Sequence, residues 1–378
     1  MEERKLLISD ETLRDGQQQP FVTFTKYQMI DLALAINGLN LPGAEHRPIH
    51  NIDIMPSMHP VHEDAARYLL ERKVPITLAT IMKKSAIKAT RDIGPDIITI
   101  SSLSDGLMDI KNIDRDRNIE STLRELSNAK RIGAKVGLAG EDSAHADLGF
   151  LKEYITACQG LAGYFIYCDT DGQADPKQTF ARIDYLKRNV SIPILMHCHN
   201  DKGNAVNNTL QGILAGADGI STTFTGIGDR AGNAPTEEVL KRLREEYEIV
   251  VEGLDYEKLE VVAEKVAKYA KVSPAAPNSP LSNLHEAGIH VDILAKARER
   301  GMEAYSHSAG EELQICIGIS SGLTALGLVY ESIGRPFPEE ARAKKILMTL
   351  KNRALRDKTS YLPPKVESIL TAARYLST

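Results

Sequence analysis

Two polar segments of the chain could bind a metal ion. The first, Asp10–Gln18, reads DETLRDGQQ, and the second reads HCHND, with His197 and His199 two positions apart. Residues i and i+2 of a strand face the same side, so both imidazoles can face one ion. Two imidazoles and a carboxylate suit an open divalent site. Histidines bonded to the backbone would explain HxH alone equally well, but Asp10 at another strand end favours a metal. We predict that Asp10, His197 and His199 bind Mg²⁺, Mn²⁺, Zn²⁺ or Co²⁺.

Other polar residues follow apolar runs and could act beside such an ion. Arg14 could stabilise an oxyanion, or it could simply pair with Asp15. Thr170 could hold a substrate carboxylate, or it could belong to an ordinary turn. Glu141 and Asp142 could provide a general base, or they could be acids that favour a helix N-terminus. Spacing alone leaves these alternatives open.

A glycine-rich segment, Thr225–Ala234, reads TGIGDRAGNA. Glycines let backbone amides approach a ligand closely, and barrel enzymes often bind phosphate in their last loops. The segment is compatible with an anionic ligand such as a coenzyme A moiety.

The elements that must position these residues are short apolar runs with amphipathic segments between them. This alternation is typical of βα units around a parallel sheet. No GxGxxG follows an early run, which disfavours an open dinucleotide-binding sheet. We therefore predict a (β/α)8 TIM barrel in the α/β class. The eight predicted strands are Lys5–Asp10, Asn51–Met55, Ile76–Ala79, Ile97–Ser101, Lys135–Ala139, Tyr164–Cys168, Ile192–His197 and Gly219–Phe224.

The 378 residues exceed what one barrel needs. Val272–Asn283 is rich in Pro, Ala, Ser and Asn and predicts a linker, with a barrel over residues 1–275 and small, mainly helical subdomains over 276–378. Helices are expected near Leu323–Ile333 and Pro338–Leu355. The long loop Gly38–His50 is expected to cover part of the barrel mouth.

Composition excludes several classes of protein. A net charge of −5 gives no sign of nucleic-acid binding. No apolar stretch is long enough for a membrane helix, and the first residues lack a signal-peptide core, so we expect a cytoplasmic protein. The four cysteines form no CxxC motif, and we expect free, buried thiols.

Three segments together resemble the isopropylmalate synthase and homocitrate synthase family. They are DETLRDGQQ, HCHNDKGNAVNNTL and GIGDRAGNAPTEEV. The resemblance continues into HEAGIH at residues 285–290 and GISSG at 318–322, and it covers roughly residues 5–330. It implies a Claisen-type condensation in which the enolate of acetyl-CoA attacks a 2-oxo acid and the thioester is then hydrolysed.

The resemblance also implies roles for individual residues. His290 and Tyr305 match a base and its partner that reach the site from the neighbouring subunit, which implies a homodimer. The other matching positions are metal ligands Asp10, His197, His199 and Asn233; Arg14 on the keto oxygen; Thr170 on the substrate carboxylate; Glu141 as a catalytic acid or base; and Gln18 and Asn233 near the substrate.

This chain departs from the family pattern at the substrate end. The fourth strand lacks the usual histidine, Asp53 replaces a longer acid on the second strand, Gln17 replaces a glutamate, and D-T-V-G becomes Asp169–Gly172 with an added acid. The substrate is therefore left open. Related carbon-carbon lyases, of the hydroxymethylglutaryl-CoA lyase or 4-hydroxy-2-oxo acid aldolase type, are the alternative function. The chain ends where leucine-regulated synthases continue, so we expect no leucine-type regulatory domain.

Overall fold

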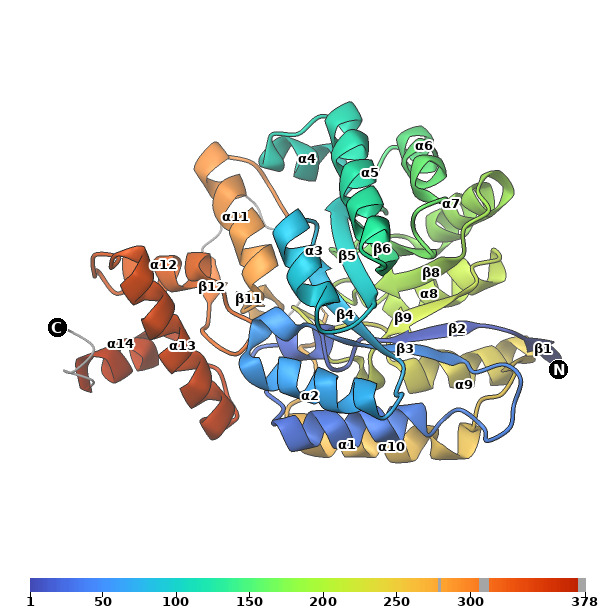
Figure 1. Cartoon of the computed structure of the whole chain (residues 1–378), viewed down its shortest axis with the longest axis horizontal. Helices are drawn as coiled ribbons and strands as arrows, with labels where there is room; N and C mark the ends of the chain where they lie inside the picture. The colour runs from blue at the N-terminus through green and yellow to red at the C-terminus, as the bar shows by residue number, and fades with distance from the viewer. Residues whose placement is uncertain (278–279, 306–312, 373–378) are drawn as a thin grey trace.

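A closed barrel of eight parallel strands forms the centre of the protein (Figure 1). The computed structural model describes residues 1–277, 280–305 and 313–372. Neighbouring strands pair in chain order, and the last pairs with the first. The predicted TIM barrel is confirmed, and each predicted strand overlaps an observed one. The strands are β2 (Leu7–Asp10), β3 (Ile49–Ile54), β4 (Ile76–Ile81), β5 (Asp96–Ser102), β6 (Lys135–Glu141), β7 (Tyr164–Asp169), β8 (Ile194–Cys198) and β9 (Gly219–Thr222).

Helices surround the barrel and bury its outer face. Their apolar faces and the outward-facing strand residues form the largest hydrophobic cluster of the protein. Local signals set their ends: Thr25 and Gln28 form a capping box on α1, and Asp114 caps α5. The helices are α1 (Lys26–Asn37), α2 (Pro60–Glu71), α3 (Lys84–Arg91), α4 (Asp105–Lys111), α5 (Arg115–Arg131), α6 (Leu148–Cys158), α7 (Pro176–Asn189), α8 (Ala205–Leu214), α9 (Thr236–Tyr247) and α10 (Leu259–Ala270).

Alternation along the strands decides which side chains face the barrel interior. On β8, Leu195 belongs to the small apolar cluster inside the barrel, whereas Ile194 and Met196 pack outward against the helices. The same alternation places Leu7 of β2 against the inner cluster and Ile8 in the outer core. Odd-numbered residues of both strands therefore face inward.

The loop Gly38–His50 lies at the opposite end of the barrel from the strand ends that form the mouth. It precedes β3, and Asn40 pairs with Leu254 next to β10 (Ile249–Val251). A further two-stranded sheet joins β10 to β1 (Glu2–Arg4) at this end. The prediction that the loop covers the mouth is wrong, because a helix-to-strand connection leads to the N-terminal end of the next strand.

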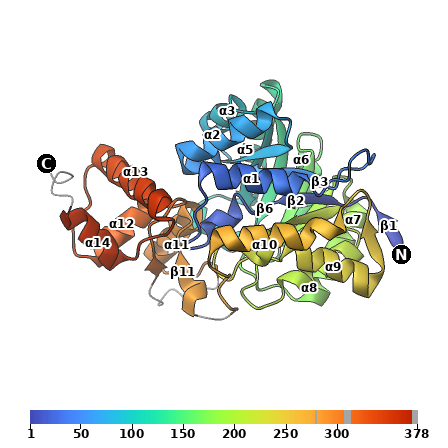
Figure 2. The same ribbon diagram turned by 90° about the horizontal axis from the view of Figure 1, so that it is seen from below.

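The C-terminal residues form a helical module beside the barrel. It contains β11 (Leu284–His285), α11 (Gly288–Arg300), β12 (Gln314–Ile315), α12 (Leu323–Ser332), α13 (Glu340–Asp357) and α14 (Pro363–Ala372). Helix α11 packs on α4 through a small apolar cluster, and α12–α14 share a separate core. Figures 1 and 2 place α12–α14 at the end of the molecule opposite the N-terminus, beyond the carboxyl ends of the barrel strands.

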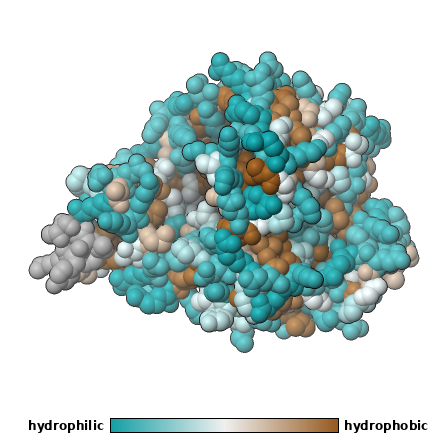
Figure 3. Space-filling model, in the orientation of Figure 1, coloured by the Kyte–Doolittle hydropathy of each residue, from teal (hydrophilic) through white to brown (hydrophobic). Residues whose placement is uncertain are grey.

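The surface is largely hydrophilic, with scattered apolar patches on the face drawn in Figure 3. Among the residues that the structure describes, no helix combines the length and apolar character needed to cross a membrane. All four cysteines are buried and free, as predicted.

Candidate active site

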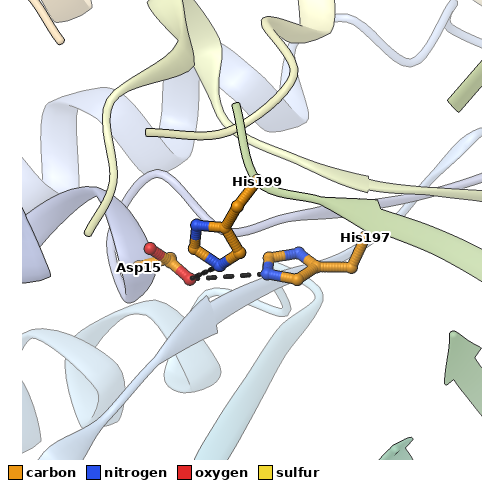
Figure 4. A group of neighbouring side chains, drawn as sticks. All are labelled: Asp15, His197 and His199. Atoms are coloured by element: carbon orange, nitrogen blue, oxygen red, sulfur yellow. Dashed lines mark ion pairs between the residues drawn. The ribbon is translucent and has the colours of Figure 1, made fainter. Parts of the chain in front are cut away.

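Two histidines and one aspartate meet at the mouth of the barrel (Figure 4). Oδ2 of Asp15 lies 3.5 Å from Nε2 of His197 and 3.8 Å from Nε2 of His199. Ligand bonds to a metal of about 2.0–2.2 Å place neighbouring donor atoms about 3 to 4 Å apart. The three side chains are almost fully buried. Their spacing and chemistry fit one divalent ion.

Asp10 does not belong to this group. Its carboxylate accepts hydrogen bonds from the backbone N–H and the hydroxyl of Thr12, at 3.1 and 2.9 Å. Strand alternation turns Asp10 outward, toward the start of α9, where burial raises its pKa to about 8. Asp15 instead returns to the mouth through the turn that follows β2. The geometry thus favours Asp15 over the predicted Asp10 as the carboxylate ligand.

The electrostatics of the group suit metal binding. Burial, together with the Arg230 guanidinium, holds the pKa of His199 well below its usual value and keeps the imidazole neutral. Nδ1 of His197 lies 3.0 Å from the backbone oxygen of Ser221, and this contact orients the ring so that Nε2 faces Asp15. Asn233 pairs with His199, and its buried Oδ1 has no hydrogen-bond partner among the described residues. This oxygen could bind a metal ion, and the role of Asn233 as a fourth ligand remains a prediction.

Arg14 also lies at the mouth, beside the predicted metal. Its Nε donates to Glu11 at 2.6 Å, and one Nη lies 3.2 Å from Asp15. Burial raises the pKa of Asp15, but the charge of Arg14 and the two histidines overcome this effect and hold it well below the usual value. Asp15 is therefore ionised, and Arg14 is held in one orientation.

Thr170 stands at the end of β7, as predicted. Its hydroxyl accepts from the backbone N–H of Asp142 at 2.8 Å, and its carbonyl accepts from Arg230. The added acid of this segment, Asp171, lies 3.6 Å from the half-exposed His145. Gln18 is buried, and its Oε1 has no partner among the described residues.

Glu141 lies at the centre of a second polar group. Its carboxylate accepts from the Tyr305 hydroxyl at 2.5 Å and from Ser102, and Lys111 lies 3.1 Å away. Burial opposes ionisation, but Lys111 and His290 lower the pKa of Glu141 below its usual value. Ser102 ends β5, the barrel strand that lacks the histidine expected from the family pattern, and α4 supplies Lys111.

His290, in the C-terminal module, contacts the barrel. Its Nδ1 lies 2.5 Å from Oδ2 of Asp229 in the glycine-rich loop, and its ring is 4.9 Å from that of Tyr305. Both residues contact the barrel of their own chain. The resemblance implied that these residues reach the site from the neighbouring subunit, and that origin remains a prediction.

The sequence analysis did not single out Asp229, Lys111 or Ser102 as functional residues. Asp229 could have been predicted from the sequence, because an acid within a glycine-rich loop at the mouth can orient a histidine. No sequence pattern pointed to Lys111 or Ser102, since the contact between β5, α4 and β6 arises only in the folded barrel.

Comparison with known proteins assigns the family. The family described as HMGL-like matches residues 5–266. This chain belongs to the HMGL-like family. It is 30% identical over 349 residues to a 2-isopropylmalate synthase of Caldanaerobacter subterraneus, covering 89% of this chain and 88% of that protein. It is 28% identical over 362 residues to a homocitrate synthase of Methanothermobacter thermautotrophicus, covering 92% and 89%.

Solved structures of the HMGL-like fold include an HMG-CoA lyase from Brucella melitensis. It superposes with a TM-score of 0.60 and 16% identity over 71% of this chain and all of the lyase. At this identity the likeness establishes the fold alone. The family resemblance predicted from three sequence segments is confirmed by the synthases of isopropylmalate and homocitrate among the relatives.

Proposed function

We propose that this protein is a metal-dependent acyltransferase that condenses acetyl-CoA with a 2-oxo acid. The products are a hydroxy acid with one more carboxylate, and free CoA after hydrolysis of the thioester. The observation that carries the proposal is the group of Asp15, His197 and His199 at the mouth, beside Arg14, in a chain related to two kinds of synthase.

The barrel residues would bind and polarise the 2-oxo acid. A divalent ion bound by Asp15, His197 and His199 supplies Lewis-acid stabilisation of negative charge on the former ketone oxygen. The Arg14 guanidinium, held on one side by Glu11 and Asp15, can donate its remaining N–H groups to the same oxygen. The Thr170 hydroxyl can donate to the substrate carboxylate while it accepts from Asp142.

The module residues would handle protons. Asp229 holds Nδ1 of His290, which leaves Nε2 to accept a proton from the methyl group of acetyl-CoA. Tyr305 and Glu141 form a short hydrogen-bonded pair next to this ring and can position the thioester or the hydrolytic water. An imidazole base suits enolisation near neutral pH.

An apolar cluster inside the barrel and the pairing of Lys111 favour a 2-oxo acid with an apolar side chain. The hydrophobic cluster inside the barrel includes Ala79, Ile98, Ile166 and Cys168, with Met55 and Ala139 packed against it. Buried polar side chains, among them Asn51 and Asp53, lie beside this cluster. Lys111, which could bind a second carboxylate, is already paired with Glu141. We therefore expect a monocarboxylic 2-oxo acid to react faster than 2-oxoglutarate.

The decisive experiment measures free CoA thiol released from acetyl-CoA in the presence of a divalent metal and a panel of 2-oxo acids. The panel runs from pyruvate and 2-oxobutyrate through 2-oxoisovalerate to 2-oxoglutarate. Release with at least one acid, dependent on that acid and abolished by a chelator, supports the synthase. If no acid of the panel releases CoA, and the protein instead cleaves a hydroxyacyl-CoA or a 4-hydroxy-2-oxo acid, the lyase function would replace the synthase function.

The homodimer implied by the resemblance remains a prediction. Sedimentation is expected to give about twice the 41.6 kDa of one chain. Because His290 and Tyr305 contact the barrel of their own chain, activity per chain should not fall on dilution below the dimer dissociation constant. Activity that disappears with the dimer would show that a neighbour supplies these residues.

A further inference from the structure

Glu11 is a buried carboxylate that contacts Arg14 but would touch neither the substrate nor the metal in the proposed chemistry. It follows β2 directly and is fully buried. Its Oε2 accepts from Arg14 Nε at 2.6 Å, and its Oε1 accepts from the Ser221 hydroxyl at 2.9 Å. A buried charge is tolerated only when its partners satisfy it, so these contacts hold the side chain firmly in place.

The two oxygens of Glu11 lead to two different parts of the active site. One holds Arg14, whose guanidinium also contacts the proposed metal ligand Asp15. The other holds Ser221, whose backbone oxygen lies 3.0 Å from Nδ1 of His197. Glu11 thus links the residue that would contact the substrate oxygen to the strand that orients a metal ligand.

A second buried acid, Asp53 on β3, lies close to Glu11. Its Oδ1 accepts from Asn51 at 2.5 Å, and Asn51 also donates to Ser9. Burial and the charge of Glu11 raise the pKa of Asp53 well above its usual value, whereas the pKa of Glu11 is lowered. Glu11 is therefore the charged member of the pair, which is the state that can hold a guanidinium.

We infer that Glu11 is a positioning residue that aims the Arg14 guanidinium at the substrate oxygen through its hydrogen bond to Nε. The inference rests on the proposed function, because it concerns the same site. Glu11, in the segment directly after β2, makes the short contact with Arg14 Nε, and within the described part of the chain the neighbouring acid Asp53 forms no hydrogen bond or ion pair with the guanidinium. A guanidinium displaced by 1 Å would lose much of its stabilisation of the transition state.

The test is a double-mutant cycle with Glu11→Gln, Arg14→Ala and the double variant. Glu11→Gln keeps the size and an oxygen that can accept from Ser221, but it removes the charge that holds Arg14. We expect it to lower kcat about 10-fold to 100-fold while KM for acetyl-CoA stays within about twofold. In the Arg14→Ala background the same change should lower kcat less than about threefold, because its target is gone.

Two further measurements separate positioning from folding and from the proposed function. Manganese content and the circular dichroism spectrum at the assay temperature should match the wild type in Glu11→Gln, although loss of a buried charge can lower the unfolding temperature. Oxalate, which can chelate the metal as a 2-oxo acid does, should bind the manganese-loaded variant more weakly than the wild type, and this loss should also vanish in the Arg14→Ala background. The oxalate measurement needs no turnover, so it tests Glu11 even if the synthase reaction is not observed.

Glu125→Gln is the matched control. Glu125 is also a buried glutamate, but it lies on α5 and contacts Arg124 and Asn128. It should change neither kcat nor oxalate affinity. The inference would be overturned if Glu11→Gln lowered kcat by the same factor in the wild-type and Arg14→Ala backgrounds. It would also be overturned if Glu11→Gln kept full activity and full oxalate affinity.

Discussion

The proposed active site has two sides that are built in different ways. On the barrel side, Asp15, His197 and His199 come from strand ends and a turn within one closed sheet, and each is nearly fully buried. On the module side, His290 lies in the first turn of α11 and Tyr305 follows that helix, and they contact Asp229 and Glu141 of the barrel, respectively. The difference suggests a rigid centre for metal and substrate, with proton-handling groups on a module that docks beside it.

The largest expected loss of activity comes from removing a metal ligand on the barrel side. His199→Ala removes a metal ligand and should lower kcat by more than about a thousand-fold, because the bound ion would contribute several kcal/mol of transition-state stabilisation. Metal content, measured by atomic emission after dialysis, should fall in parallel while the circular dichroism spectrum stays unchanged. His46→Ala, at the opposite end of the barrel, is the control. A fully active His199→Ala protein would eliminate the metal assignment.

The next effect tests whether the two sides are chemically separate. His290→Gln should lower kcat about 100-fold to 10,000-fold, the usual contribution of a general base, yet keep the bound metal. Metal content and kcat, measured on the same preparation, distinguish this variant from His199→Ala. Loss of metal from His290→Gln would show that the module also holds the ion and that the two sides are not independent.

The docking of the module can be weakened without touching the chemistry. Ile293 is buried in the cluster between α11 and α4, one turn after His290. Ile293→Ala should lower the free energy of unfolding by about 2–5 kcal/mol, measured by urea denaturation, and reduce kcat by misplacing His290. The exposed Val261→Ala on α10 should change neither quantity noticeably. Unchanged kcat with the expected loss of stability would show that His290 is positioned without this packing.

The smallest effect concerns the pH dependence of stability. Burial raises the pKa of Glu286 to about 7 in the folded protein, above 4.5 for the free side chain, and its partners Ser320 and Ser360 only partly oppose this. The folded state therefore keeps a proton that the unfolded state loses, and stability should fall as the pH rises from about 4.5 to 7, by at most about 1.4 kcal/mol per pH unit. Glu286→Gln should make the slope measured in urea titrations shallower, because other buried acids such as Asp10 keep their own contributions. An unaltered slope would assign it to another group.

Much of the barrel could be read from the sequence. Strand positions follow from short apolar runs bounded by polar turns, a signal that is local in the chain. His197 and His199 were also predictable, because a spacing of two on a strand places both on one face whatever surrounds them. Cysteine burial followed from apolar neighbours in the same way.

Tertiary structure alone decided the remainder of the site. Whether Asp10 or Asp15 joins the histidines depends on which residues of β2 face inward and on the turn that follows, and the inward face is defined only once the sheet closes. Glu11 and Arg14, Lys111 and Glu141, and His290 and Asp229 meet because packing brings distant or turned segments together. Composition and spacing determined which chemical groups this chain possesses, and closure of the barrel and docking of the module determined which of them meet.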